Sequence, residues 1–248
     1  MNSTSIELNG VTFSYDGTRE VLKNVSMTFP EKGMTAIVGE SGCGKSTVVN
    51  MLVGAFRPKS GNITIGGVPL ENLSRESYYS RLASVSYNTY IFNQTVRENF
   101  LLAKNRQPTM RFTPRSARSI LRSLYARTAD SIKLLRRMQT IYRADKTTAC
   151  ACGQSCRRQR YHIFDEATSN IDVESEAIIM RNIKALSDDK NVIVISHRLA
   201  NIMPADNIYF MENGEIKESG EHTALIRDKH GYEKLFNAQK QLEEGYAL

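Results

Sequence analysis

The sequence predicts an α/β fold: a parallel core sheet with helices, an N-terminal antiparallel β-subdomain and an inserted helical lobe. Three observations predict it. An apolar β-prone run at residues 34–38 leads through a glycine-rich turn into a helical pattern at 45–53. Later apolar strands at 163–164 and 192–195 flank a helical pattern, and strands that alternate with helices indicate a parallel sheet. Within the first thirty residues, apolar side chains instead recur at every second position in short runs, as in β-strands.

In this first part, alternating apolar residues surround an Asn-Gly pair. Ile6 and Leu8 precede Asn9-Gly10, and Val11 and Phe13 follow it. Asn-Gly between such runs is typical of a two-residue hairpin turn. We therefore expect a hairpin that turns at Asn9-Gly10, with residues 25–29 continuing the antiparallel layer.

The remaining elements follow from the same patterns. Residues 62–65 are expected to form a strand and residues 95–103 a helix. Ile179, Ile183 and Leu186 recur at helical spacing. Asn213-Gly214 predicts a hairpin between strands at 208–211 and 215–217, and residues 232–242 predict a closing helix.

Length and composition limit the class of protein. The 248 residues can bury a full core without disulfides or metal, and we expect one domain over residues 1–248. No apolar stretch approaches the roughly 20 residues that cross a bilayer, and the first ten residues lack the pattern of a signal peptide. The sequence therefore predicts a cytoplasmic protein.

Charge is unevenly distributed. The net charge is +7, yet residues 104–160 hold fifteen lysines and arginines against two acids, which leaves the rest of the chain at −6. Three of the four cysteines lie in the same segment. No clear apolar period runs through it, so residues 105–160 are anomalous within the helical lobe expected at 74–158.

The turn before the first predicted helix reads Gly-Glu-Ser-Gly-Cys-Gly-Lys-Ser-Thr and fits G-x-x-x-x-G-K-[ST] at every fixed position. Its glycines let N–H groups point at phosphate oxygens, its lysine adds a positive charge, and its serine hydroxyl suits Mg²⁺. An incidental glycine-rich turn is the weaker interpretation, because a strand precedes it and a helix follows. The sequence predicts a P-loop NTPase, whose nucleotide site contains Gly39, Glu40, Ser41, Gly42, Cys43, Gly44, Lys45, Ser46 and Thr47.

Two acids end the next predicted core strand. Asp165 stands where a P-loop enzyme holds Mg²⁺, and Glu166 is placed to act as general base toward an attacking water. An acidic helix cap is the alternative interpretation of the pair. Tyr161 and His162 are polar where this strand should be apolar.

A histidine follows the last apolar core strand. His197 comes directly after residues 192–196, at the edge of a parallel sheet where ligands bind. It could contact a γ-phosphate there. A purely structural histidine is the alternative.

Together these motifs resemble the nucleotide-binding domain of ABC transporters of the exporter type. The resemblance covers residues 1–104 and 161–248. Tyr15, in Val-Thr-Phe-Ser-Tyr, is similar to the aromatic A-loop, and residues 90–99 resemble the stretch after the Q-loop. The D-loop, the switch region and the family's ending are similar to residues 169–172, 196–198 and 211–222.

The resemblance implies a RecA-like core and an ATPase that couples hydrolysis of ATP to transport, with Mg²⁺ as cofactor. It implies a transmembrane domain or subunit and a second nucleotide-binding domain as partners, at the cytoplasmic face of a membrane. The implied roles are adenine stacking for Tyr15, a grip on the β- and γ-phosphates for Lys45, Mg²⁺ binding for Ser46 and Asp165, general base for Glu166, and γ-phosphate contact for His197.

Two departures from the family stand out. Tyr87 replaces a glutamine that helps to hold Mg²⁺, and the signature Leu-Ser-Gly-Gly-Gln, which closes on the partner's ATP, is absent from the sequence. A composite site of the family's usual kind cannot form without it. The alternative function is therefore an ATP-binding pseudo-enzyme that is deficient in hydrolysis.

The genetic code offers an explanation for the missing signature. Residues 141–146 can be encoded ATC-TAT-CGG-GCG-GAC-AAA, and reading from the third base gives CTA-TCG-GGC-GGA-CAA, which is Leu-Ser-Gly-Gly-Gln. We therefore hypothesise that residues 105 to about 161 are translated out of frame between two compensating shifts. A diverged helical lobe is the competing interpretation.

Other functions fit the anomalous segment less well. Cys150, Cys152 and Cys156 with His162 match no common zinc spacing. The arginines accompany no motif that reads nucleic acid, so no nucleic-acid partner is expected, and a DNA-repair or chromosome-associated ABC ATPase is disfavoured.

Overall fold

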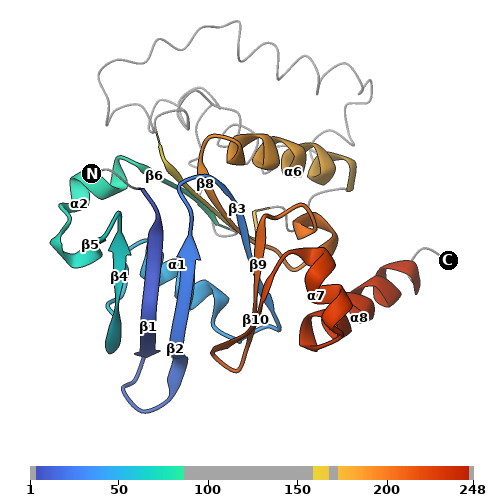
Figure 1. The fold of residues 1–248 in the computed structure, drawn as a ribbon, viewed down its shortest axis with the longest axis horizontal. Coiled ribbons are helices and arrows are strands. Elements are labelled where there is room, and N and C mark those ends of the chain that lie inside the picture. Colours follow the sequence, from blue (N-terminus) through green and yellow to red (C-terminus); the bar gives the residue numbers. More distant parts are fainter. Residues whose placement is uncertain (1–3, 87–158, 168–172, 246–248) are drawn as a thin grey trace, which may run out of the picture. The chain divides into compact units, whose positions relative to one another are not determined.

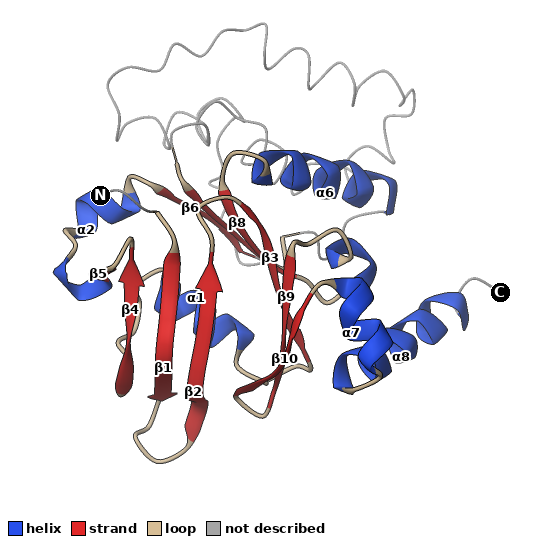
Figure 2. Ribbon diagram, viewed as in Figure 1, coloured by secondary structure: helices blue, strands red, loops and turns tan. Residues whose placement is uncertain are grey.

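The computed structural model describes residues 4–86, 159–167 and 173–245, all of which belong to one compact unit. It contains two sheets (Figures 1 and 2). The first is antiparallel, with the order β2-β1-β4-β5, and is formed by β1 (Ile6–Ser14), β2 (Glu20–Phe29), β4 (Ser60–Ile65) and β5 (Val68–Pro69). The predicted antiparallel layer and the predicted strand at 62–65 are confirmed.

The second sheet is the core, with the order β10-β9-β3-β8-β7-β6. Its pairs are parallel except that of β9 with β10. The predicted α/β fold with a parallel core is therefore confirmed. Its strands are β3 (Gly33–Gly39), β6 (Leu82–Ser86), β7 (Tyr161–Asp165), β8 (Asn191–Ile195), β9 (Asn207–Glu212) and β10 (Glu215–Gly220).

Helices cover both faces of the core sheet, because successive residues on its apolar strands face opposite sides and both sets must be buried. Ile37 belongs to a cluster with the antiparallel sheet and α1 (Lys45–Leu52). Ala36 and Val38 join a second cluster, on the face covered by three later helices (Figure 1). These are α6 (Val173–Ser187), α7 (His222–Asp228) and α8 (Gly231–Gly245).

The predicted hairpin turn at Asn9-Gly10 is wrong. Strand β1 runs through both residues, and its register with β2 shifts between Leu8 and Val11, so the pair forms an irregularity in a continuous strand. Gly10 takes a φ of 60° there, which suits a bulge as well as a turn. The chain turns later, where Oδ1 of Asp16 accepts hydrogen bonds from the backbone N–H groups of Thr18 and Arg19 at 2.9 and 3.0 Å.

The predicted hairpin at Asn213-Gly214 is confirmed. Both residues have positive φ, 51° and 83°, as a type I′ turn requires. Gly214 is also needed for packing, because a Cβ there would lie 2.4 Å from the carbonyl oxygen of Val21.

The polar start of β7 is buried rather than exposed. Tyr161 and His162 are each 1% exposed, and the Tyr161 ring lies 6.0 Å from that of Tyr78 on α2 (Arg75–Tyr79). Burial raises the pKa of Tyr161, so its phenol stays neutral. A large aromatic body makes this position compatible with a buried strand.

Most of the helical lobe expected at 74–158 lies outside the described residues, as do the helix expected at 95–103, Tyr87 and residues 169–172. Of its first residues, 75–79 form α2 and 82–86 form β6, the edge strand of the core sheet. The domain boundaries of the lobe stay a prediction.

Candidate functional site

The glycine-rich loop connects β3 to α1, at the carboxyl end of a buried core strand. Gly39 has a φ of 148°, and a Cβ on it would lie 2.1 Å from the carbonyl oxygen of Met211. Gly44 has a φ of 112°, and a Cβ on it would lie 2.8 Å from Cδ2 of Leu22. Only Gly42, with a φ of 81°, faces open space. Two of the three glycines are therefore required by packing of the loop against β9 and β2, and not only by approach of a phosphate.

The start of α1 has the properties of an anion site. Gly44 precedes the helix in a left-handed conformation, and within the described part of the chain no side chain caps it. The first turn holds no acidic residue. Its N–H groups, together with the positive end of the helix dipole, are therefore available to phosphate oxygens.

Lys45 lies inside this loop. Its side chain is buried, and Nζ donates to the carbonyl oxygens of Gly39 and Glu40 at 2.8 Å each. Sγ of the buried Cys43 lies 3.8 Å from the same nitrogen. The ammonium group is thus held within the turn of the loop by groups that carry no full charge, so a phosphate would be a stronger partner.

Tyr15 lies beside the first turn of α1. Its hydroxyl is 3.0 Å from Oγ1 of Thr47, and its ring meets those of Phe13 and Phe56 edge-on, at 4.9 and 5.3 Å between centroids. Tyr15 is 55% exposed, so a planar base can reach it. Phe56 was not anticipated from the sequence, because its contact with Tyr15 joins residues far apart in the chain.

Asp165 ends β7 in a position that suits a cation. Its Oδ1 is buried and has no hydrogen-bond partner among residues 4–86, 159–167 and 173–245. Burial raises the pKa of Asp165, and the charge of Glu166 adds to this, whereas Lys45 and His197 lower it. Glu166, Lys45 and His197 are all near enough to affect the pKa of Asp165. The fold therefore brings the glycine-rich loop and both later motifs together.

Glu166 and His197 lie across neighbouring parallel strands. Nε2 of His197 is 2.6 Å from Oε1 of Glu166. Glu166 has a φ of 52°, and its backbone N–H donates to the carbonyl of Ile195, at the end of β8, at 2.9 Å. This left-handed turn, which a non-glycine residue rarely takes, directs the carboxylate toward the histidine.

The other predicted site residues surround these groups. Glu40, Ser41, Gly42 and Ser46 are exposed, and Cys43, Gly44 and Thr47 are buried. Ser46 lies in the first turn of α1, next to Lys45. The structure thus gathers the predicted residues of the three motifs at one edge of the core sheet, with Tyr15 beside α1.

Comparison with known proteins identifies this arrangement. A sequence profile described as "ABC transporter" matches residues 22–169. The chain belongs to the ABC transporter family. It is the ATP-binding component of such a transporter, as the P-loop and the two later motifs predict.

Relatives of this ABC component are longer proteins. It is 31% identical to an uncharacterized ABC transporter ATP-binding protein of Haemophilus influenzae, over 98% of this chain and 44% of the relative. It is 30% identical to a multidrug resistance ABC transporter ATP-binding and permease protein of Lactococcus lactis, over 96% of this chain and 41% of the relative. The chain therefore spans less than half the length of these relatives.

A solved ABC exporter has the same fold. The structure of a bacterial Atm1-family ABC exporter with ATP bound matches with a TM-score of 0.80 and 25% identity, covering 96% of this chain and 42% of that one. Among the helices that the structure describes, none combines the length and apolar character that crossing a bilayer requires.

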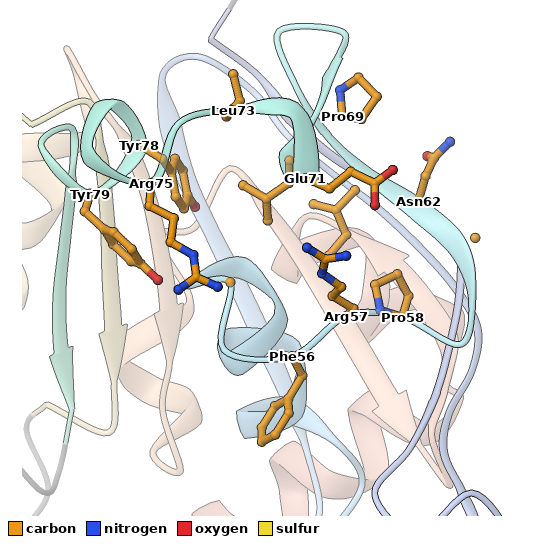
Figure 3. Close-up of a pocket in the computed structure, with 14 residues that line it drawn as sticks. Phe56, Arg57, Pro58, Asn62, Pro69, Glu71, Leu73, Arg75, Tyr78 and Tyr79 are labelled. Atoms are coloured by element: carbon orange, nitrogen blue, oxygen red, sulfur yellow. The ribbon is translucent and has the colours of Figure 1, made fainter.

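This ABC component has a separate pocket, and Phe56 is among the residues that line it (Figure 3). Its volume is about 150 Å³. Its lining comes from the chain between α1 and β4, from β4 itself, and from residues 69–79, which include η1 (Leu70–Asn72) and α2. Figure 3 shows the guanidinium groups of Arg57 and Arg75 beside it, with the ring of Tyr79. The pocket is lined by none of the predicted phosphate-site residues.

Proposed function

We propose that this chain hydrolyses ATP and so drives an exporter-type ABC transporter. The observation that carries the proposal is the convergence of Lys45, Asp165 and the Glu166–His197 pair at the carboxyl ends of β3, β7 and β8. Ligands bind at this edge of parallel sheets. The pattern of a strand, a phosphate loop and a helix supports the same place for the triphosphate.

The donor set fits a magnesium ion. Ser46 and Asp165 would hold Mg²⁺, since a hydroxyl and a carboxylate are ligands that this cation prefers. The buried Oδ1 of Asp165, which has no hydrogen-bond partner within the part of the chain that the structure describes, supports this role. Bound Mg²⁺ would neutralise charge on the β- and γ-phosphate oxygens.

The protein groups have distinct roles in the proposed reaction. Lys45 would bind the β- and γ-phosphates, with the free N–H groups of α1, and Tyr15 would stack on adenine. Glu166 would accept a proton from the attacking water. His197, already within hydrogen-bonding distance of that carboxylate, would orient it and contact the γ-phosphate.

We also propose the partners that such a motor needs. The relative from L. lactis is named as an ATP-binding and permease protein, and this chain matches 41% of it. We infer that the chain works with a transmembrane domain or subunit and a second nucleotide-binding domain, at the cytoplasmic face of a membrane. The transported substrate would be recognised by the transmembrane part.

A second candidate function is that of an ATP-binding pseudo-enzyme. It is favoured by the absence of Leu-Ser-Gly-Gly-Gln from the sequence and by Tyr87. Loss of one donor to transition-state charge commonly costs about 10²–10³ in rate. This function would retain tight binding of MgATP with little hydrolysis.

We propose that the missing signature results from the two compensating frameshifts around residues 105 to 161. In support, Tyr161, the first residue of β7, is already buried in the core, next to the point where the proposed reading frame returns. Sequencing the gene across codons 100–165 tests this directly. Codons that do not yield Leu-Ser-Gly-Gly-Gln in the alternative frame would leave the diverged lobe as the explanation.

The experiment that separates the two functions combines binding and turnover. MgATP binding to the purified chain is measured by calorimetry, and phosphate release is measured on the same preparation. Binding with phosphate release, abolished in Glu166→Gln, supports the ATPase. Binding without release supports the pseudo-enzyme, and absence of binding by folded protein contradicts both.

A further inference from the structure

A buried glutamate on α6 contacts the segment that carries His197. Glu176 is 4% exposed, and both oxygens of its carboxylate have partners. Oε2 binds Nη1 of Arg198, and Oε1 accepts a hydrogen bond from Nδ2 of Asn201 at 2.7 Å. Because a buried carboxylate is costly without such partners, the two contacts are a built feature of the fold.

The same segment is held from two further directions. Oε1 of Gln239 on α8 accepts a hydrogen bond from the backbone N–H of Leu199 at 3.1 Å. The Ser196 hydroxyl closes a small turn, because Oγ accepts from the N–H of Arg198 at 3.0 Å and donates to its carbonyl at 3.1 Å. The backbone on both sides of His197 is therefore fixed, while the imidazole itself reaches Glu166.

Among the contacts that hold the segment around His197, the one between Glu176 and Arg198 joins two charged groups. Arg198 is half exposed and directly follows the histidine, whereas Glu176 is almost fully enclosed. Elsewhere on the same helix, Lys184 forms an ion pair of 2.8 Å with Asp206, which does not involve the histidine segment. Among the described side chains of this helix, Glu176 and Lys184 form ion pairs, and only that of Glu176 bears on the site.

We propose that Glu176 is a positioning residue for His197: its bonds to Arg198 and Asn201 hold the imidazole where it recognises the γ-phosphate of ATP. The inference rests on the proposed function, because it requires His197 to contact that phosphate. ADP lacks the γ-phosphate. The ratio of the Kd values for MgADP and MgATP therefore measures the contact without any need for turnover.

The test measures both Kd values by calorimetry for the wild type, Glu176→Gln, His197→Ala and the double variant. Glutamine keeps the shape of the side chain and removes the charge that pairs with Arg198. We expect Glu176→Gln to reduce the preference for MgATP by about fivefold or more, with the Kd for MgADP within about twofold of the wild type. In the His197→Ala background, Glu176→Gln should reduce the preference no further, because both changes remove the same contact.

Matched controls separate positioning from loss of structure. Lys184→Gln removes the other ion pair of α6 and should lower the thermal midpoint while leaving the MgATP preference unchanged. Asn201→Ala removes the hydrogen bond that an uncharged side chain donates to Glu176, and should reduce the preference even if Glu176→Gln folds poorly.

The outcomes distinguish this inference from the proposed function. A preference that persists in Glu176→Gln and Asn201→Ala but is lost in His197→Ala would overturn the role of Glu176 alone. Equal affinity of the wild type for MgATP and MgADP would also overturn it, although ATP binding would stand. Failure of the folded wild type to bind either nucleotide would overturn the proposed function itself.

Discussion

Nε2 of His197 lies 2.6 Å from Oε1 of Glu166, across the ends of two adjacent parallel strands. The pair brings a proton acceptor and a group suited to phosphate contact to one point at the sheet edge. Glu166 reaches this position through a left-handed backbone conformation, with a φ of 52°. Such a conformation is costly, and its presence at the strand end is consistent with a functional constraint.

Glu166→Gln should separate binding from chemistry. Glutamine keeps the size of the side chain but cannot accept the proton of the attacking water. We expect the Kd for MgATP to change by less than about twofold and the rate of phosphate release in a single turnover to fall by about 10²–10⁴. Hydrolysis by the variant at the wild-type rate would exclude Glu166 as the general base.

Tyr15→Ala should weaken binding through the base alone. Stacking of a base on an aromatic ring contributes about 1–3 kcal/mol, so the Kd for MgATP should rise by about tenfold. Tripolyphosphate, which has no base, should bind both proteins equally, and this can be checked by displacement of a fluorescent nucleotide. Tyr79→Ala, at the separate pocket, is the matched control. Equal weakening of ATP and tripolyphosphate would argue against adenine stacking.

Asp165→Asn should make the nucleotide-free protein more stable. Burial and the neighbouring charge of Glu166 raise the pKa of Asp165, so its ionised form opposes folding at neutral pH. We expect the thermal midpoint of the variant to be about 2 °C higher at pH 7. A raised pKa means that the folded state binds its proton more tightly, so this difference should close as the pH falls toward 3.8, the ordinary value.

Magnesium provides the second half of that test. MgATP should raise the midpoint of the wild type and have little effect on Asp165→Asn, because the variant lacks a ligand for the cation. A variant that is less stable than the wild type without nucleotide, or equally stabilised by MgATP, would contradict this account of Asp165.

Asp206 should have the opposite pH dependence. Partial burial opposes ionisation, but hydrogen bonds from Lys184 at 2.8 Å and from the N–H of Met34 at 2.7 Å lower the pKa of Asp206. Its contribution to stability is therefore complete above the ordinary value of 3.8 and is lost as the pH falls through the lower folded value. Asp206→Asn should lower the free energy of unfolding at pH 7 and have little effect in stronger acid.

The exposed pair of Lys32 and Asp189, 3.9 Å apart, is the control for this prediction. Asp189→Asn should change the unfolding free energy by less than about 0.5 kcal/mol at either pH, because exposed ion pairs contribute little. Chemical denaturation at several pH values measures both variants. A deficit of Asp206→Asn that grows with acidity would contradict the assignment.

Short-range patterns predicted much of this fold. Residues 192–195 are wholly apolar, residues 34–38 are apolar except for Thr35, and both runs form buried parallel strands. Asn213-Gly214 forms its expected turn. Asn9-Gly10 misled because the same dipeptide serves a bulge when apolar residues on both sides pair with one strand. The local sequence is alike in the two cases, and only the partner strand distinguishes them.

Tertiary contacts explain what the sequence did not predict. Tyr161 and His162 looked too polar for a core strand, yet both are buried, and the ring of Tyr161 packs against that of Tyr78. Phe56 and Glu176 belong to no motif, and their contacts with Tyr15 and Arg198 join distant parts of the chain. Site residues within contiguous motifs were accessible from the sequence, whereas residues that support them from other elements were not.

The central claim is that the loop between β3 and α1 binds the triphosphate of ATP through Lys45. Calorimetric titration of MgATP into folded wild type, Lys45→Ala and Lys59→Ala tests it most directly, since Lys59 is exposed and pairs with Glu20 at 3.4 Å on the antiparallel sheet. We expect saturable binding to the wild type and Lys59→Ala, and an affinity at least about 100-fold lower in Lys45→Ala. Equal affinity in all three proteins, or no binding by the folded wild type, would contradict the account.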